Sequence, residues 1–314
     1  MQMLLRKPFP VLLILDIHSY CNAKCTICPY PKLKNMIPMG IMEEFVFKKI
    51  IDDFRNISKK YSFKGSVIFC NMGELFCHPD LALERLKYVI ESDLDSKIQT
   101  NGSLLTPDVA DKLVQFGFNG IIRISCHGIS PSVYERIMGL DLQRTLNNIK
   151  YLSEVYPKEK IEIVSIPHDW PNGEARRVRS FFKGLGIRVR MALPNNRAGL
   201  VTWMDIKNKH KLVACKSHRP LGEMVISFNG NVLLCCNDMA QKEIVGNLYN
   251  QSIEEVWNGC EMVDKLEKIY CGKPSENSFI CKQCEFGITS LSSIRRLSRN
   301  IRHECKKLFF TRVW

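Results

Sequence analysis

Residues 11–28 read VLLILDIHSYCNAKCTIC, a short apolar run followed within a few positions by three cysteines. The run Val11–Ile17 has the length and the apolar character of a strand that is buried on both faces. Cys21, Cys25 and Cys28 then fall in the loop that follows this strand. Parallel α/β folds place their chemistry at the carboxyl ends of the strands, so this loop is a candidate functional site.

Similar apolar, β-branched runs continue along the chain and alternate with stretches of helical periodicity. The six runs are Val11–Ile17, Ser66–Asn71, Ser96–Thr100, Gly120–Cys126, Lys160–Ile166 and Ile187–Leu193. Amphipathic segments lie between them, near residues 41–60, 80–92, 106–116, 131–156 and 172–185. This order predicts βα units and a parallel sheet. An open sheet and a curved partial barrel would give the same pattern.

The pattern changes after about residue 205, where a hairpin signal appears. Met224–Phe228 and Val232–Leu234 flank the turn dipeptide Asn229-Gly230. A helix is predicted to open at Ser252, and a cysteine-bearing loop follows at 281–284. We therefore expect a second, smaller module with mixed helices and strands.

Composition limits the class of protein. A chain of 314 residues with 45% hydrophobic content is long enough to bury a sizeable core, which argues against disorder or a fibrous repeat. It carries 14 cysteines, no signal-peptide pattern and no apolar window near the roughly 20 residues of a membrane span. We therefore expect a cytoplasmic protein whose thiols serve metal or redox chemistry.

The number of thiols in the first cluster indicates its chemistry. A closed structural zinc site needs four ligands, whereas three thiolates on a four-iron four-sulfur cluster leave one iron free for an outside ligand. A zinc site completed by His18 or by a remote cysteine is the alternative interpretation.

The C-x3-C-x2-C spacing of Cys21, Cys25 and Cys28 resembles the fingerprint of the radical S-adenosylmethionine (radical SAM) superfamily. The resemblance implies a partial (β/α)6 TIM-like barrel and a 4Fe-4S cluster that binds S-adenosylmethionine (AdoMet). Further matches lie at or after the ends of the second, third and fourth predicted strands, and the resemblance implies that they contact AdoMet. They are Gly73 and Glu74, where Met72 departs from the usual glycine, then Thr100 and Asn101, and finally Ser125. Ordinary turns are the alternative interpretation of these residues.

A second set of cysteines resembles the auxiliary-cluster extension of the SPASM and Twitch subfamilies. The resemblance implies that Cys215, Cys235, Cys281 and Cys284 hold an auxiliary 4Fe-4S cluster, as the G-x4-C spacing from Gly230 to Cys235 suggests. Cys236 is the alternative to Cys235, and four thiolates would suit zinc equally well. Among the remaining cysteines, Cys271 is the first candidate for a further ligand.

The resemblance also implies a reaction. The reduced first cluster would cleave AdoMet to methionine and a 5'-deoxyadenosyl radical, which abstracts hydrogen from a substrate carbon. A fully ligated second cluster suits removal of the extra electron, so we expect oxidation of a small polar, sugar-like or cyclitol-like metabolite. Arg197 is the predicted catalytic base, with Arg190 behind it, and both have the alternative reading of surface side chains. An external one-electron donor such as flavodoxin or ferredoxin would supply the electron.

Three other functions stay open. About ten residues precede the first strand, too few for a separate peptide-recognition segment, yet a maturase that crosslinks or epimerises a ribosomal peptide is the main alternative. An RNA-modifying enzyme would use the net charge of +13, and a zinc-binding scaffold would lack catalysis. We expect no DNA partner.

The sequence predicts a barrel over residues 1–205, a SPASM- or Twitch-like module over 206–290 and a basic amphipathic tail over 291–314. Docking of the tail on the barrel, contact with a membrane surface and binding of a partner are its three interpretations.

Overall fold

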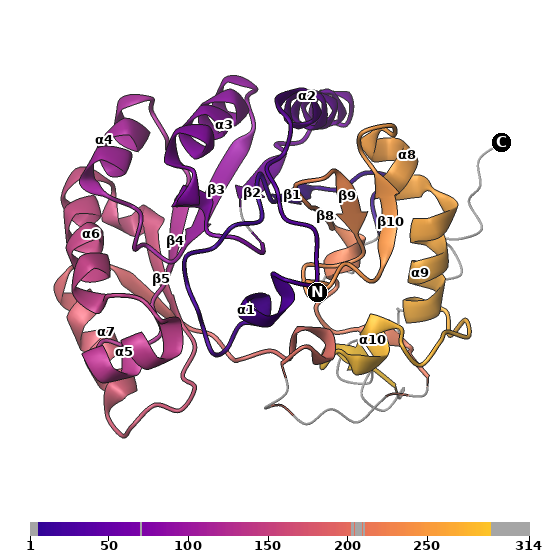
Figure 1. The fold of residues 1–314 in the computed structure, drawn as a ribbon. Coiled ribbons are helices and arrows are strands. Elements are labelled where there is room, and N and C mark those ends of the chain that lie inside the picture. The colour runs from indigo at the N-terminus through magenta and orange to yellow at the C-terminus, as the bar shows by residue number, and fades with distance from the viewer. Residues whose placement is uncertain (1–5, 70, 202–203, 205–208, 210, 290–314) are drawn as a thin grey trace. The chain divides into compact units, whose positions relative to one another are not determined.

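The computed structural model describes residues 6–69, 71–201, 204, 209 and 211–289 (Figure 1). These residues form two compact units. The barrel unit comprises Ile14–Pro194 with Ser227–Asn229, and the C-terminal unit comprises the rest of the described chain. The predicted tail over 291–314 lies outside the described residues.

The barrel unit is built on a sheet whose strands follow one another in chain order. The strands are β1 (Leu12–Leu15), β2 (Ser66–Phe69), β3 (Asp95–Thr100), β4 (Ile121–Ser125), β5 (Ile161–Ser165) and β6 (Arg188–Met191). The pairs from β2 to β6 are parallel. Each of the six predicted runs coincides with one strand, although β3 begins one residue earlier than predicted, at Asp95, and this confirms the α/β class.

Helices alternate with these strands, and all but the short first one, which belongs to the segment after β1, lie along the outer face of the sheet (Figure 1). They are α1 (Tyr30–Leu33), α2 (Glu44–Lys60), α3 (Pro79–Glu91), α4 (Pro107–Gln115), α5 (Pro131–Met138), α6 (Leu142–Val155) and α7 (Glu174–Gly184), with single 3-10 turns at Leu75–Cys77 and Lys158–Lys160. Ile122, Ile124, Ile161 and Ile163 are fully buried beneath the helices. The side chains that alternate with them therefore lie on the opposite, inner face.

The prediction of a single helix over residues 131–156 is wrong. The segment 131–156 forms two helices, because Gly139 takes the left-handed conformation (φ +64°) and ends α5. Asp141 then caps α6 by accepting a hydrogen bond of 2.8 Å from the Arg144 N–H. Since glycine adopts positive φ at no steric cost, the chain turns here instead of continuing as one helix.

The C-terminal unit contains short strands and helices. Its strands are β7 (Ala214–Cys215), β8 (Glu223–Ile226), β9 (Asn231–Leu233), β10 (Ile244–Asn247) and β11 (Gly287–Ile288), and its helices are α8 (Ile253–Asn258), α9 (Cys260–Tyr270) and α10 (Ile280–Gln283), with 3-10 turns at Arg197–Gly199 and Arg219–Leu221. β8, β9 and β10 are antiparallel, and β11 pairs with β7. The predicted hairpin around Asn229-Gly230 is confirmed, as is the helix start at Ser252, where Glu255 completes a capping box.

None of the described helices is long and apolar enough to cross a membrane.

Candidate functional site

The first three cysteines lie in a loop after β1 that is fastened at both ends. The Lys24 N–H donates to the Met138 carbonyl (3.1 Å) and the Thr26 N–H donates to the Ile137 carbonyl (2.9 Å), so the loop lies on the end of α5. The Cys21 N–H donates to the Tyr30 hydroxyl (3.0 Å), which in turn donates to the Ser19 carbonyl (2.8 Å). Hydrogen bonds from backbone N–H groups of the loop to α5 and to Tyr30 thus hold the loop in place.

Burial of these thiols opposes a free, deprotonated thiolate in the loop. Burial raises the pKa of the Cys21 thiol to about 12. Burial, followed by the nearby thiols of Cys28 and Cys21, raises the pKa of Cys25 further. At neutral pH such thiols give up their protons only when a cation replaces them. The three thiols of Cys21, Cys25 and Cys28 are the type of donor that a thiolate-bound iron–sulfur cluster uses.

The Gly73-Glu74 turn lies against the cysteine loop. A Cβ atom on Gly73 would come within 2.6 Å of the Tyr20 carbonyl oxygen, so only glycine fits. The Glu74 N–H donates to that same carbonyl at 2.8 Å. Position 73 is therefore fixed by a close backbone approach.

The buried Glu74 carboxylate joins the ends of two strands. It accepts hydrogen bonds from the Thr100 hydroxyl (2.5 Å), the Asn101 N–H (2.6 Å) and the Phe76 N–H (3.3 Å). Burial raises the pKa of Glu74, and the bonds from Thr100 and Asn101 oppose that rise. Glu74 thereby orders the carboxyl ends of β2 and β3.

A polar network connects the end of β3 with the cysteine loop. The Asn101 side-chain amide donates to Asn22 Oδ1 (2.9 Å), and the Asn22 amide donates to Ser103 Oγ (2.9 Å). Asn22 follows Cys21 directly, so the structure brings Gly73, Glu74, Thr100 and Asn101 next to the cysteine loop. Ser125 ends β4 on the inner face and is half-buried.

Asp16 is a residue of this site that the sequence reasoning missed. Its Oδ1 accepts from the Asn71 N–H (2.6 Å) and the Met72 N–H (3.0 Å), which fixes the chain just before Gly73. Its Oδ2 is buried without a hydrogen-bond partner among the described residues. Burial raises the pKa of Asp16 to about 6, against the lowering effect of the two N–H donors. A lone acid inside the apolar run was the available signal.

Asp16→Asn should change how stability depends on pH. The asparagine carbonyl can accept the same two N–H bonds, but it does not titrate. In the wild type the unfolded chain loses its Asp16 proton first, because the folded pKa is higher, so stability falls as pH rises between the two pKa values. From about pH 5 to about pH 7.5 the wild type should lose about 1 kcal/mol relative to the variant. Urea unfolding at both pH values measures this, and parallel curves would contradict it.

The second set of cysteines lines a cavity in the C-terminal unit. Cys215, Cys235, Cys281 and Cys284 are all buried and surround this cavity together with small and apolar side chains. Cys236 does not line it, since its sulfur accepts a hydrogen bond of 2.9 Å from Arg219 Nη1. The cavity favours Cys235 over Cys236 as a ligand.

One amide and one ammonium group lie close to these cysteines. The Asn237 amide donates to the Cys284 sulfur at 3.8 Å, and its Oδ1 is buried without a partner among the described residues. Lys209 Nζ donates to the carbonyls of Cys284 and Gly287, both at 2.5 Å. Such donors and charges suit a group with negatively charged sulfur atoms.

Arg197 lies with the second cysteine set. It belongs to the C-terminal unit, in the 3-10 turn Arg197–Gly199, and its Nη1 donates to the Cys236 carbonyl at 3.4 Å. Its role as a base stays a prediction. Arg190 lies on β6 in the barrel unit.

The ligand roles of the seven cysteines also stay predictions. Within the described part of the chain, no three or more His, Cys, Asp or Glu side chains have the geometry of a site for a single metal ion. Cys260 and Cys271 are exposed, and Cys70 and Cys305 lie outside the described residues.

Comparison with known families gives the class of protein. Residues 16–170 match the radical SAM superfamily, and residues 215–285 match the SPASM iron-sulfur cluster-binding domain. The chain is a radical SAM superfamily protein with a SPASM-type C-terminal domain. The two domains imply a 4Fe-4S cluster, an auxiliary cluster and AdoMet.

Individual relatives are distant. The chain is 21% identical, over 86% of its length and 90% of the relative's, to the AdoMet-dependent 2-deoxy-scyllo-inosamine dehydrogenase of Niallia circulans. It is 26% identical to the AdoMet-dependent heme synthase of Methanosarcina barkeri, over 46% of this chain but only 39% of that protein. Among solved structures, Streptococcus suis SuiB bound to precursor peptide SuiA superimposes with a TM-score of 0.64 at 17% identity, covering 89% of this chain and 70% of SuiB. The likeness supports the partial-barrel fold.

Proposed function

We propose that the protein is a radical SAM enzyme that generates a 5'-deoxyadenosyl radical and oxidises a small polar metabolite at carbon. One observation carries the proposal. The three-cysteine loop is hydrogen-bonded to the Gly73-Glu74 turn and to Asn101, so the proposed cluster ligands and the proposed AdoMet contacts form one connected site.

When bound, the first cluster supplies the electron that breaks a carbon–sulfur bond of AdoMet. The chain supplies the geometry. Three thiolates from Cys21, Cys25 and Cys28 leave one coordination position open. The backbone at Gly73 faces the loop that carries them, and Glu74 keeps the ends of β2 and β3 at a fixed spacing.

Oxidation is favoured by the surroundings of the second cysteine set. A positive charge near a thiolate-bound cluster stabilises its reduced state and so makes it a better electron acceptor. Lys209 contacts the carbonyl of Cys284, and Arg219 contacts the neighbouring Cys236. These cations support an electron-accepting role for the auxiliary cluster. A flavodoxin or ferredoxin would supply electrons to the first cluster. We propose that the protein is cytoplasmic.

A small substrate is supported by the dehydrogenase relative, whose length the chain covers almost completely. The second candidate is maturation of a ribosomal peptide, which the likeness to peptide-bound SuiB supports. In either case Arg197 is the proposed base.

Anaerobic reconstitution tests the proposal. The protein should bind about eight iron atoms if both clusters form, and with dithionite and AdoMet it should release 5'-deoxyadenosine. Iron content and liquid chromatography of the nucleoside measure these outcomes. A colourless zinc protein that leaves AdoMet intact would overturn the proposal.

A further inference from the structure

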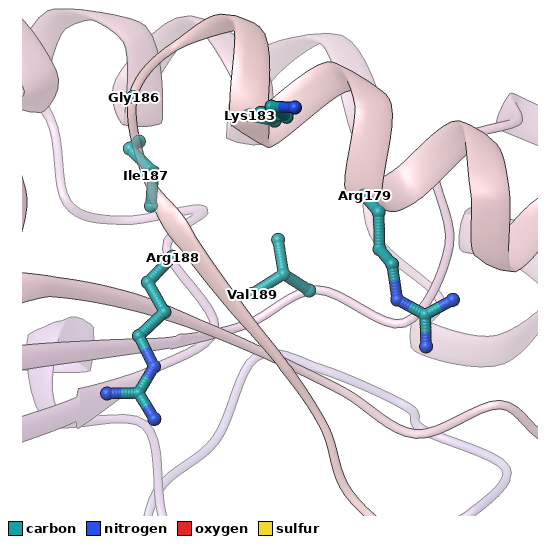
Figure 2. Close-up of a pocket in the computed structure, with 6 residues that line it drawn as sticks. All are labelled: Arg179, Lys183, Gly186, Ile187, Arg188 and Val189. Carbon is teal, nitrogen blue, oxygen red and sulfur yellow. The ribbon is translucent and has the colours of Figure 1, made fainter.

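The inner face of the barrel sheet is polar over its last four strands. Ile122, Ile124, Ile161 and Ile163 occupy the helix-covered face, so Arg123 and Glu162 lie on the other face. Figure 2 shows the same alternation on β6, where Val189 is directed toward α7 and Arg188 is directed away from it. Arg190, two residues on, shares the inner face with Arg188.

One carboxylate on this face contacts two arginines from different strands. Arg123 Nε donates to Glu162 Oε2 at 2.8 Å, and Arg190 Nε lies 3.5 Å from Glu162 Oε1. Within the described chain, neither arginine makes any other hydrogen bond or ion pair. Glu162 therefore orients both guanidinium groups through Nε and leaves their terminal Nη groups to bind something else.

Charge and exposure on this face favour an anion. The side chains of Arg123 and Arg190 are 31% and 45% exposed, whereas that of Glu162 is 13% exposed. Lys97 and Arg188 also lie on the inner face of β3–β6, and Asp95 is the other acid. Cations outnumber acids there.

The groove between α7 and the start of β6 is also basic. This groove of about 470 Å³ is lined by Arg179, Lys183 and Arg188 (Figure 2). A concentration of like charge along such a groove attracts ligands of opposite charge. Arg123, Glu162 and Arg190 do not line this groove, so it is separate from the cluster around Glu162.

The register places Arg190 beside the proposed AdoMet site. Ser125 pairs with Val164, and Val164 pairs with Arg190, so these three residues form one layer near the carboxyl ends of the strands. At about 4.8 Å between strands, Arg190 lies about 10 Å from Ser125. The proposed AdoMet contacts end at Ser125 on β4, and a second molecule beside AdoMet would meet β5 and β6.

We propose that Arg190 and Arg123, oriented by Glu162, bind an oxyanion of the substrate, either a carboxylate or a phosphate. Guanidinium groups bind both ions through paired hydrogen bonds. This inference rests on the proposed function and narrows it, because the substrate then carries a negative charge instead of being a neutral polyol.

The test is binding of simple oxyanions to the reconstituted, AdoMet-loaded protein. Inorganic phosphate and malonate are titrated separately by calorimetry, which distinguishes the two sources of negative charge. We expect saturable binding of at least one of them to the wild type. Arg190→Gln should weaken that binding about tenfold or more, and Arg190→Lys should restore part of it. Arg176→Gln removes an exposed charge from α7 and should leave the affinity unchanged.

Two results would overturn the inference. One is the absence of saturable anion binding to a wild-type protein that does bind AdoMet. The other is an Arg190→Gln variant that binds the anions normally but binds AdoMet more weakly, which would assign the guanidinium to the cofactor. Failure of the wild type to cleave AdoMet would instead count against the proposed function, independently of the anion titration. Circular dichroism checks that each variant is folded.

Discussion

Cys25→Ala should abolish formation of 5'-deoxyadenosine. Cys25 is half-buried, with its sulfur 3.8 Å from the Met138 carbonyl oxygen, in a loop whose backbone is fixed by α5. Two remaining thiolates in a fixed loop cannot replace the third ligand. The variant should lose about four iron atoms and all cleavage of AdoMet.

Cys260→Ala is the matched control, because Cys260 is an exposed cysteine of α9. It should keep the iron content and the nucleoside yield of the wild type. Wild-type cleavage by the Cys25 variant would show that the first cysteine cluster does not carry the chemistry.

Cys281→Ala should separate cleavage of AdoMet from oxidation of substrate. Cys281 lines the cavity of the C-terminal unit, so its loss should reduce the iron content from about eight to about four atoms. The first cluster has its own ligands, so 5'-deoxyadenosine should still form. Substrate oxidation should be lost, because the proposed electron acceptor is missing.

The neighbouring thiol gives a sharp comparison. Cys236→Ala should retain the second set of iron atoms, since the Cys236 sulfur is hydrogen-bonded to Arg219 and does not line the cavity. Loss of iron from this variant and its retention in Cys235→Ala would reverse the ligand assignment. Full substrate turnover by Cys281→Ala would exclude the electron-accepting role.

Local patterns in the sequence are sufficient for strands β1–β6 and for most of the helices between them. Each of the six strands coincides with a run of apolar, β-branched residues that alternates with a helical segment, so each could be recognised from the sequence. The helical pattern of 131–156 did not reveal its interruption, because the hydrophobic spacing continues through Gly139 and only the left-handed backbone of that residue shows the break.

The parts of the site that were missed depend on contacts between distant segments. Asp16 meets Asn71 and Met72 only because β1 and β2 are neighbours in the sheet. The choice between Cys235 and Cys236 depends on which sulfur faces the cavity, which spacing does not encode. The contacts of Glu162 with two arginines likewise require the register of β4, β5 and β6.

The close backbone approach at Gly73 limits which substitutions the site can accept. With the Glu74 amide hydrogen-bonded to the Tyr20 carbonyl next to Cys21, a displacement of one segment displaces the other. If these segments hold the cluster and AdoMet as proposed, the contact would couple the placement of the inorganic cluster to that of the nucleoside-bearing cosubstrate. Substitutions that enlarge residue 73 should disturb both at once, whereas the neighbouring position tolerates methionine in place of the family's usual glycine.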